Sequence, residues 1–279
     1  MKRYIGIFIV GVSFMALLFF GQKTYVNAKA YERSMSQLVA QMSAKKVVQR
    51  QLDTLAEQLS LGLYKNSSKE KFKVLKKEVE SYRMKSLTYV KYALAPFVVI
   101  LGSYFLFSLR LFTFVGALGG FIALIFGLLT PLMMVTIHKK VDYLGDVVLS
   151  FESKGILGSI SKLFEGGDWV VAGVILLFSV VVPLIKICSL LFISLFMESR
   201  FAHSMVKFFK LIGKWSMVDV FVVATFLVYL TANKGDVSHA EVEVGLYFFL
   251  VYVLVSMLVS LSADRMLHQH KRLKGIEVS

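Results

Sequence analysis

Six long apolar runs constrain this chain of 279 residues more than any other feature of its sequence. A transmembrane helix needs about 20 predominantly apolar residues to cross the hydrocarbon core of a bilayer. The hydrophobic share of the sequence, 57%, is also well above that of an ordinary soluble domain. The sequence therefore predicts an all-α polytopic membrane protein with six transmembrane helices. The runs cover residues 4–20, 88–108, 112–137, 169–197, 217–233 and 244–263.

The loops between the runs predict the orientation of the chain. Loop 198–216 and the segment after Ala263 are rich in Lys and Arg, whereas loop 234–243 is acidic. Because short basic loops stay in the cytoplasm, both termini are predicted to be cytoplasmic and loop 138–168 to lie outside. Region 22–86 is placed outside by alternation, although it is strongly basic. The first run is expected to remain as an uncleaved anchor.

Two segments outside the predicted membrane spans have patterns of their own. Region 22–86 contains two apolar seams at helical spacing, which predict a periplasmic helical hairpin that runs on from the first two spans. The hairpin would be either a self-packed stalk or a docking arm for a partner or for anionic lipid headgroups. Loop 138–168 predicts a strand near residues 143–151 and then a short amphipathic helix, as a small mixed subdomain on the outer face. The seam residues are Val48, Leu52, Leu55, Leu59, Phe72, Leu75, Val79 and Tyr82.

The sequence carries few signs of catalysis. It has no P-loop or dinucleotide-type Gly-rich loop, no His-Glu-x-x-His and no Gly-x-Ser-x-Gly. The single cysteine, Cys188, rules out a disulfide or a Cys-based zinc site within one chain, and it is expected to be a small buried residue. We therefore expect no enzyme, no catalytic residues, no metal and no cofactor. The net charge of +14 lies in the gaps between apolar runs, so nucleic acid is not an expected partner.

Two charges of opposite sign lie inside predicted spans. Lys186 and Asp219 should reach a similar depth near the inner leaflet, since Trp215 marks the membrane boundary one turn before Asp219. A charged side chain within a span costs about 2.5–3.5 kcal/mol on insertion scales. We predict that Lys186 and Asp219 pair or share one polar network, to which Trp215 also belongs. The alternative is that Lys186 extends to the inner interface while Asp219 caps its own helix.

Three further residues predict local irregularity in the spans. Pro131 and Pro183 lie within apolar runs, where each predicts a kink or a place at which the bundle opens. Gly127 precedes Pro131 by about one turn. A glycine at this position predicts a close approach between two helices.

Several motifs in this part of the chain resemble the paraquat-inducible protein A family. The sequence Trp215-x-Met-x-Asp-Val-Phe221 is similar to the signature motif of that family. Thr130-Pro131, the segments 155–160 and 168–172, and Pro183-x-x-Lys186 are similar to other family positions and follow in the same order. The resemblance covers residues 112–267 as one four-span module.

The resemblance implies a lipid-handling function. Members of the family are inner-membrane proteins that work beside proteins with mammalian-cell-entry (MCE) domains, whose assemblies bridge the periplasm and carry lipids. This chain would accordingly pass phospholipid between the inner membrane and an MCE-domain partner. Residues 1–111 are not covered, residues 268–279 would form a cytoplasmic tail, and the Cys-x-x-Cys zinc ribbons found in many members are absent. Two other functions stay open: a small-solute or ion transporter that uses Lys186 and Asp219, and a scaffold or regulator that transports nothing.

Overall fold

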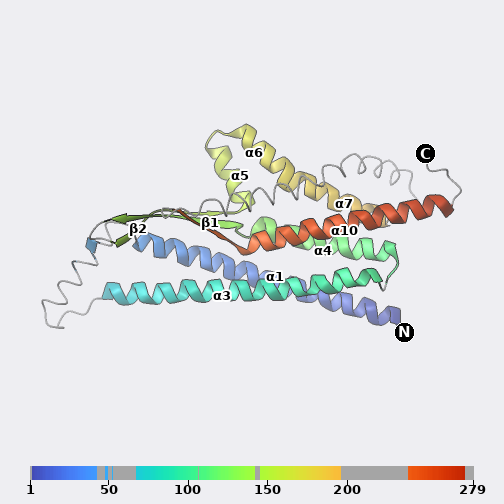
Figure 1. The fold of residues 1–279 in the computed structure, drawn as a ribbon, viewed down its shortest axis with the longest axis horizontal. Helices are drawn as coiled ribbons and strands as arrows, with labels where there is room; N and C mark the ends of the chain where they lie inside the picture. The colour runs from blue at the N-terminus through green and yellow to red at the C-terminus, as the bar shows by residue number, and fades with distance from the viewer. Residues whose placement is uncertain are drawn as a thin grey trace.

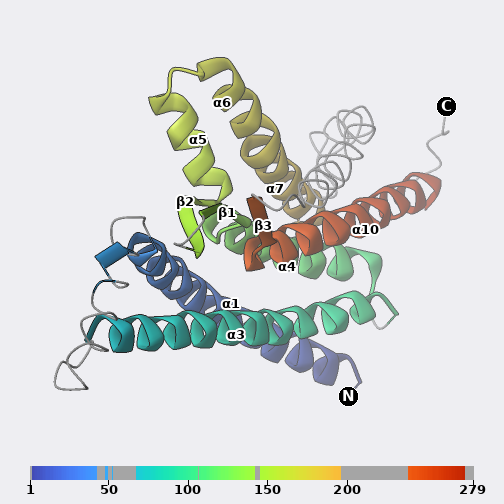
Figure 2. The same cartoon turned by 60° about the vertical axis from the view of Figure 1, so that its left-hand side comes forward.

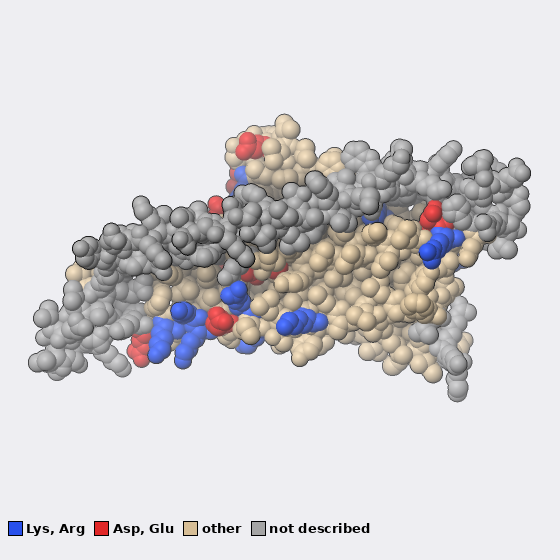
Figure 3. Space-filling view, in the orientation of Figure 1, with Lys and Arg blue, Asp and Glu red and all other residues tan. Residues whose placement is uncertain are grey.

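The computed structural model describes residues 2–42, 48–49, 52, 67–105, 107–141, 145–195 and 238–273. Within these ranges, five helices are long and apolar enough to cross a membrane, which confirms the predicted class of all-α polytopic membrane protein. The predicted span 217–233 lies outside the described residues. Figure 3 shows a broad uncharged area on one face, between charged side chains towards its two ends, as expected for a surface in contact with lipid.

The first two helices extend far beyond the apolar runs that they contain. α1 (Lys2–Gln41) is a single helix of 40 residues and α3 (Ser67–Gly102) one of 36 residues. At 1.5 Å per residue, α1 is about 60 Å long, which is twice the thickness of a hydrocarbon core. The two helices lie side by side and run in opposite directions (Figure 1). The helical extension predicted for region 22–86 is therefore a continuation of the spans themselves.

The seam predicted on α3 is where this helix pair packs. Leu75 and Val79 of α3 are buried in one cluster with Tyr31 and Leu38 of α1. The apolar 3–4 spacing places these side chains on one face of each long helix, so the pair has its own narrow core. The other predicted seam, over residues 48–59, lies mostly outside the described residues.

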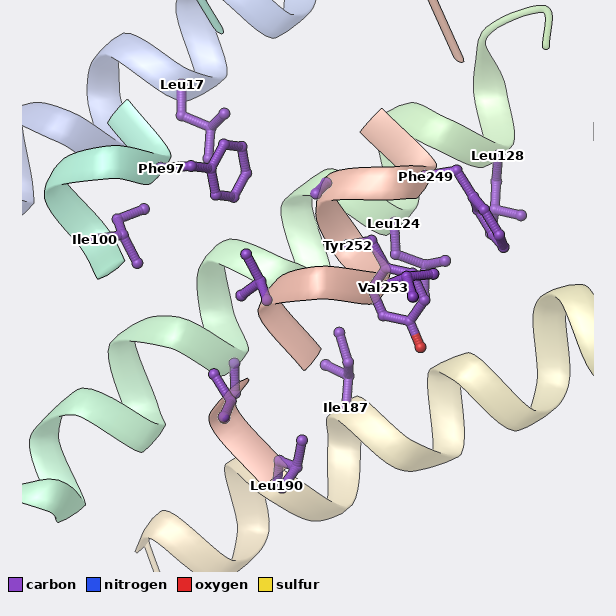
Figure 4. Close-up of a cluster of buried hydrophobic side chains, with 14 of the residues drawn as sticks. Leu17, Phe97, Ile100, Leu124, Leu128, Ile187, Leu190, Phe249, Tyr252 and Val253 are labelled. Atoms are coloured by element: carbon purple, nitrogen blue, oxygen red, sulfur yellow. The ribbon is translucent and has the colours of Figure 1, made fainter. Parts of the chain in front are cut away.

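The main core forms around α4 (Leu109–Leu129), which packs against α10 (Val244–Leu273) and α7 (Val182–Leu195). Figure 4 shows apolar side chains from α1, α3, α7 and α10 converging on α4. Small residues on α4 allow this close packing, because a Cβ added at Gly120 would lie 3.3 Å from the Ile187 side chain. α10 continues to Leu273, so the first residues of the predicted cytoplasmic tail are helical.

One predicted span is too long. The apolar run 112–137 was expected to form one helix, but α4 ends at Leu129 and β1 (Met133–Val141) begins four residues later. Pro131 lies between them. Proline has no N–H to continue the helix, and the chain beyond it finds backbone partners in two other strands instead. Hydropathy alone does not distinguish an apolar strand from the end of an apolar helix.

A small antiparallel sheet covers one end of the helix bundle. Its strand order is β2–β1–β3, with β2 spanning Gly145–Lys154 and β3 spanning Ser238–Val242. Met133 of β1 is paired with Lys154 on one side and with Val242 on the other. β2 leads into the amphipathic helix α5 (Ile156–Glu165), so the predicted strand followed by a short helix is confirmed. The participation of β3, which precedes α10, was not predicted.

The helix after α5 has three parts. α6 (Trp169–Leu176) passes through a π-helical turn, η2 (Leu177–Val181), into α7. Figure 2 shows α5 and α6 side by side, as an arm that leads away from the sheet and back towards the bundle. Cys188 on α7 is exposed, so the prediction that it is buried was wrong. The reason is that an apolar residue in a span can face lipid as readily as the protein interior.

Candidate functional site

The irregular turn η2 shapes the helix that carries the buried lysine. In η2 the Val182 N–H donates a hydrogen bond to the Leu177 carbonyl, five residues earlier. Pro183 follows directly, and it has neither an N–H to donate nor room for the carbonyl of Ser179 in a regular α-helix. The wider π turn accommodates both effects. Such turns in α-helices often occur at functional sites.

Lys186 lies one turn beyond Pro183 and is buried between α7 and α10. Its side chain is only 5% exposed, and its Nζ donates a hydrogen bond to the Ser256 Oγ of α10 at 3.2 Å. The Ser256 hydroxyl in turn donates to the Val253 carbonyl at 3.0 Å. Serine thus accepts from the ammonium with its oxygen while its own proton is bound within α10. The result is a cation fixed at a helix–helix contact inside the bundle.

Among the described residues, several apolar side chains of α7 and α10 lie in the same region as this cation. Ile187 and Leu190 of α7, together with Tyr252 and Val253 of α10, are buried in the same cluster (Figure 4). A low-dielectric environment strengthens any interaction between the ammonium and an anionic group that reaches it. The arrangement can therefore recognise negative charge at membrane depth. It does not fit a lysine that extends along the protein surface towards the interface, because so little of the side chain is exposed.

Two of the predicted site residues cannot be placed. Asp219 and Trp215 lie outside the described residues, so the pairing of Asp219 with Lys186 stays a prediction. Ser256 was missed by the sequence reasoning, because a serine in an apolar run is common and only the packing of α10 on α7 brings it to the lysine. Among the described residues, no group of three His, Cys, Asp or Glu side chains could hold a metal ion.

Pro131 lies in a junction between helix ends, not inside a helix. Its carbonyl accepts a hydrogen bond from the Gly245 N–H at 3.0 Å, and the Leu132 carbonyl accepts one from the Glu243 N–H at 2.9 Å. The carbonyls just beyond α4 are thus satisfied by N–H groups at the start of α10. Both sets of groups lack partners within their own helices. Pro131 is therefore a point where elements are joined, and it produces no kink in α4.

Gly127 and Gly245 bring α4 and α10 to backbone distance at this junction. A Cβ added at Gly127 would lie 3.0 Å from the Phe249 backbone nitrogen. One added at Gly245 would lie 2.6 Å from the Pro131 carbonyl oxygen and 2.7 Å from that of Thr130. α4 and α10 therefore meet at Gly127, the residue for which a close approach was predicted. Gly245 was missed, and the only signal was a glycine at the very start of an apolar run.

These features define a class of protein. Long apolar helices, a buried lysine at membrane depth and a small sheet joined to the helix ends describe a polytopic α-helical membrane protein with a polar site inside its bundle. The sequence comparisons give the family. The model of the family described as paraquat-inducible protein A matches residues 113–271, more than half of the chain, and the chain belongs to this family.

The individual relatives are distant. The chain is 25% identical over 115 residues to a Haemophilus influenzae protein named "Probable intermembrane transport protein". It is 26% identical over 115 residues to the "Intermembrane transport protein PqiA" of Escherichia coli K12. Each match covers 39% of this chain and only 27% of the relative, so the similarity concerns about a quarter of those proteins. No solved structure shows a significant match.

Proposed function

We propose that this protein takes part in moving phospholipid between the inner membrane of a bacterial envelope and a periplasm-spanning partner with MCE domains. It would do so without catalysing a reaction. Two relatives with names that refer to intermembrane transport support the general role. The membrane architecture agrees with it, because several helices of this protein are long and apolar enough to lie in the bilayer that supplies the lipid.

The observation that carries the proposal is the buried Lys186 ammonium on Ser256. A cation within a span is expensive and is rarely kept without a function. The phosphate of a phospholipid is an anion that enters a bundle together with apolar chains, and the described part of the site combines the Lys186 cation with neighbouring apolar side chains. An ammonium forms charge-assisted hydrogen bonds with phosphate oxygens, which are about twice as strong as neutral ones.

The π turn before Lys186 offers a way to admit the lipid. α10 packs along α4 and is joined to it at the Pro131 junction, whereas α7 packs mainly on α4 and only lightly on α10. The backbone around Pro183 lacks one hydrogen bond of a regular helix, so it is the weakest part of this span. In the proposed function, a small shift of α7 at this point opens the contact between Lys186 and Ser256 to the bilayer.

The proposed topology places both termini in the cytoplasm. The N-terminal end of α1 and the C-terminal end of α10 lie at the same end of the molecule, which is consistent with this placement (Figure 1). The sheet and the far ends of α1 and α3 would then face the periplasm, where an MCE-domain partner would be met. The long α1–α3 pair, which self-packs through Leu75 and Val79, would be either a stalk or the docking arm.

The test is to measure phospholipid retained by the purified full chain. Protein extracted in mild detergent is analysed by mass spectrometry for bound phospholipid and for co-purifying envelope proteins. Lys186→Met keeps the length of the side chain and removes the charge. We expect this variant to retain several-fold less phospholipid than the unchanged protein. Lys91→Met is the matched control, because Lys91 is an exposed lysine on α3 and its loss should leave the lipid content unchanged.

The outcomes separate the candidate functions. Absence of phospholipid and of any envelope partner in the unchanged protein would refute the proposal. Equal phospholipid content in the Lys186→Met and Lys91→Met variants would mean that Lys186 does not bind the lipid. Ion flux in proteoliposomes that depends on Lys186, without bound lipid, would indicate the transporter function instead.

A further inference from the structure

A second feature lies at the opposite end of the bundle from the sheet. It is an open groove of about 280 Å³. It is lined by the end of α3, the short helix η1 (Ser103–Phe105), the start of α4 and the C-terminal half of α10. Its walls are aromatic and aliphatic, and its polar groups are the Tyr104 hydroxyl and the side chains of Ser262 and Arg265. The lining residues are Leu101, Tyr104, Phe105, Phe112, Leu258, Leu261, Ser262 and Arg265.

The groove lies where three candidate spans reach the membrane surface. One span ends at Phe105, the next begins at Leu109, and the span in α10 ends at Met266. Tyrosine and arginine concentrate at this level, because each combines an apolar body with a polar tip. The groove therefore opens at the boundary between hydrocarbon and headgroups, where phospholipid phosphates are found.

The aromatic wall is ordered and open towards the bilayer. The Tyr104 ring meets the Phe112 ring edge-to-face with 5.1 Å between centroids, and the Phe105 ring at 5.5 Å. Phe105 is 87% exposed. An aromatic side chain with so much exposed surface at the end of a span is stable in contact with acyl chains, not with water. The wall thus provides the apolar half of a lipid site.

Arg265 provides a cation at the rim. Its Nη1 donates a hydrogen bond to the Tyr104 hydroxyl at 2.9 Å. Within the described part of the chain this is the one hydrogen bond of the Arg265 side chain, and it leaves most of the five N–H donors of the guanidinium directed elsewhere. The planar fork of an arginine matches two oxygens of a phosphate. Tyr104 therefore holds the guanidinium in place above the apolar wall.

We propose that this groove binds one phospholipid of the surrounding leaflet. The lipid phosphate binds Arg265, and part of an acyl chain lies along Leu258, Leu261 and Phe105. The volume is slightly below the usual range for ligand pockets, about 300–1,000 Å³, so the groove holds part of the lipid and leaves the rest in the bilayer. The inference rests on the proposed function for the class of ligand, and it assigns that ligand a site of its own.

The groove and the Lys186 site lie on different faces of α10. Ser256, which contacts Lys186, and Arg265 are nine residues apart, so at about 100° per residue they point to opposite sides of the helix. The same spacing separates them by roughly 14 Å along the helix axis. A lipid in the groove therefore does not touch Lys186, and substitutions can address the two sites separately.

Native mass spectrometry of the full chain in mild detergent, titrated with phosphatidylglycerol, tests the assignment. We expect Arg265→Gln, compared in a Lys186→Met background so that the bundle site does not contribute, to raise the Kd for phosphatidylglycerol at least tenfold. Leu258→Trp, which fills the groove and keeps the cation, should do the same. Tyr104→Phe keeps the ring but releases the guanidinium, so a smaller rise of about threefold is expected. Arg272→Gln removes a charge further along the same helix, beyond the groove residues, and should leave the Kd unchanged.

Three results would overturn the assignment. Unchanged lipid affinity in Arg265→Gln or in Leu258→Trp would exclude the groove. An equal loss in Arg272→Gln would indicate general attraction between opposite charges. Competition by inorganic phosphate as effective as that by the lipid would indicate an anion site without an acyl-chain component. If Arg265→Gln fails to fold, the Kd values for Tyr104→Phe and Leu258→Trp decide the matter, since both keep the arginine.

The proposed function and the groove fail in different ways. If Lys186→Met loses its retained phospholipid while Arg265→Gln binds lipid normally, the proposed function is supported and the groove site is refuted. If Lys186→Met retains phospholipid normally while Arg265→Gln binds lipid more weakly, the groove site is supported and the role of Lys186 is refuted.

Discussion

The junction between α4 and α10 makes a sharp prediction about Gly245→Ala. The added methyl would lie 2.6 Å from the Pro131 carbonyl oxygen and 2.7 Å from two oxygens of Thr130. Ordinary contact begins at about 3.4 Å, and two of the three oxygens belong to the backbone, so the helix ends must separate. The Gly245–Pro131 and Glu243–Leu132 hydrogen bonds, at 3.0 Å and 2.9 Å, would lengthen with them.

The expected size of the effect follows from those two hydrogen bonds. A buried backbone group that loses its partner costs about 1–3 kcal/mol. Loss of one bond would cost about 1–3 kcal/mol and loss of both about 2–6 kcal/mol, so the central expectation is about 2–4 kcal/mol. The better helix propensity of alanine recovers at most about 1 kcal/mol of this, and less at the first turn of α10 than in a helix interior. The net expectation is a loss of about 2–3 kcal/mol.

Thermal unfolding in detergent, followed by circular dichroism, measures this effect. We expect Gly245→Ala to lower the Tm by roughly 5–10 °C, at about 2–4 °C per kcal/mol. Gly173→Ala is the matched control, because Gly173 is within α6 and a Cβ there would meet no atom within 4 Å. The control should be as stable as the unchanged protein or slightly more stable. If Gly245→Ala and Gly173→Ala have the same Tm, the junction does not hold the ends of α4 and α10 as close together as the structure shows.

Two other predictions concern charged residues. Exchange of Lys186→Asp and Asp219→Lys should impair phospholipid retention in each single variant and restore it in the double variant if the two residues pair; absence of any rescue would refute the pairing. Arg110 donates to the carbonyls of Ser194 and Leu195 at the end of α7, at 2.9 Å and 2.8 Å, and accepts at its own carbonyl from the Ser194 hydroxyl. Arg110→Met should therefore lower the free energy of unfolding by about 1–3 kcal/mol, measured by the same melting assay. Arg110→Lys should be intermediate in stability, because an ammonium cannot bind both carbonyls as the guanidinium does. A loss of stability no larger than that of Lys91→Met would contradict the capping role of Arg110.

Hydropathy was sufficient to predict the class of protein and most of its helices. A span is a local property, since its backbone hydrogen bonds form within the segment and its apolar surface is satisfied by lipid. The 3–4 spacing of Leu75 and Val79 likewise predicted the face on which α3 packs. The same measure failed at residues 130–137, which are not helical, and at Cys188, which is exposed. It records how apolar a residue is, and not whether its backbone pairs across a sheet or whether its side chain faces lipid.

The sequence by itself determined that this chain crosses a membrane several times and that Lys186 is a charged residue within a membrane span. The tertiary structure decided what surrounds that charge. Ser256 is 70 residues away in the chain, Gly245 meets Pro131 across 114 residues, and Arg265 meets Tyr104 across 161 residues. Contacts at such separations leave no periodic pattern in the sequence, because each depends on which helix faces pack together. Helix formation is local, whereas the polar site, the junction and the groove exist only once α3, η1, α4, α7 and α10 have packed together.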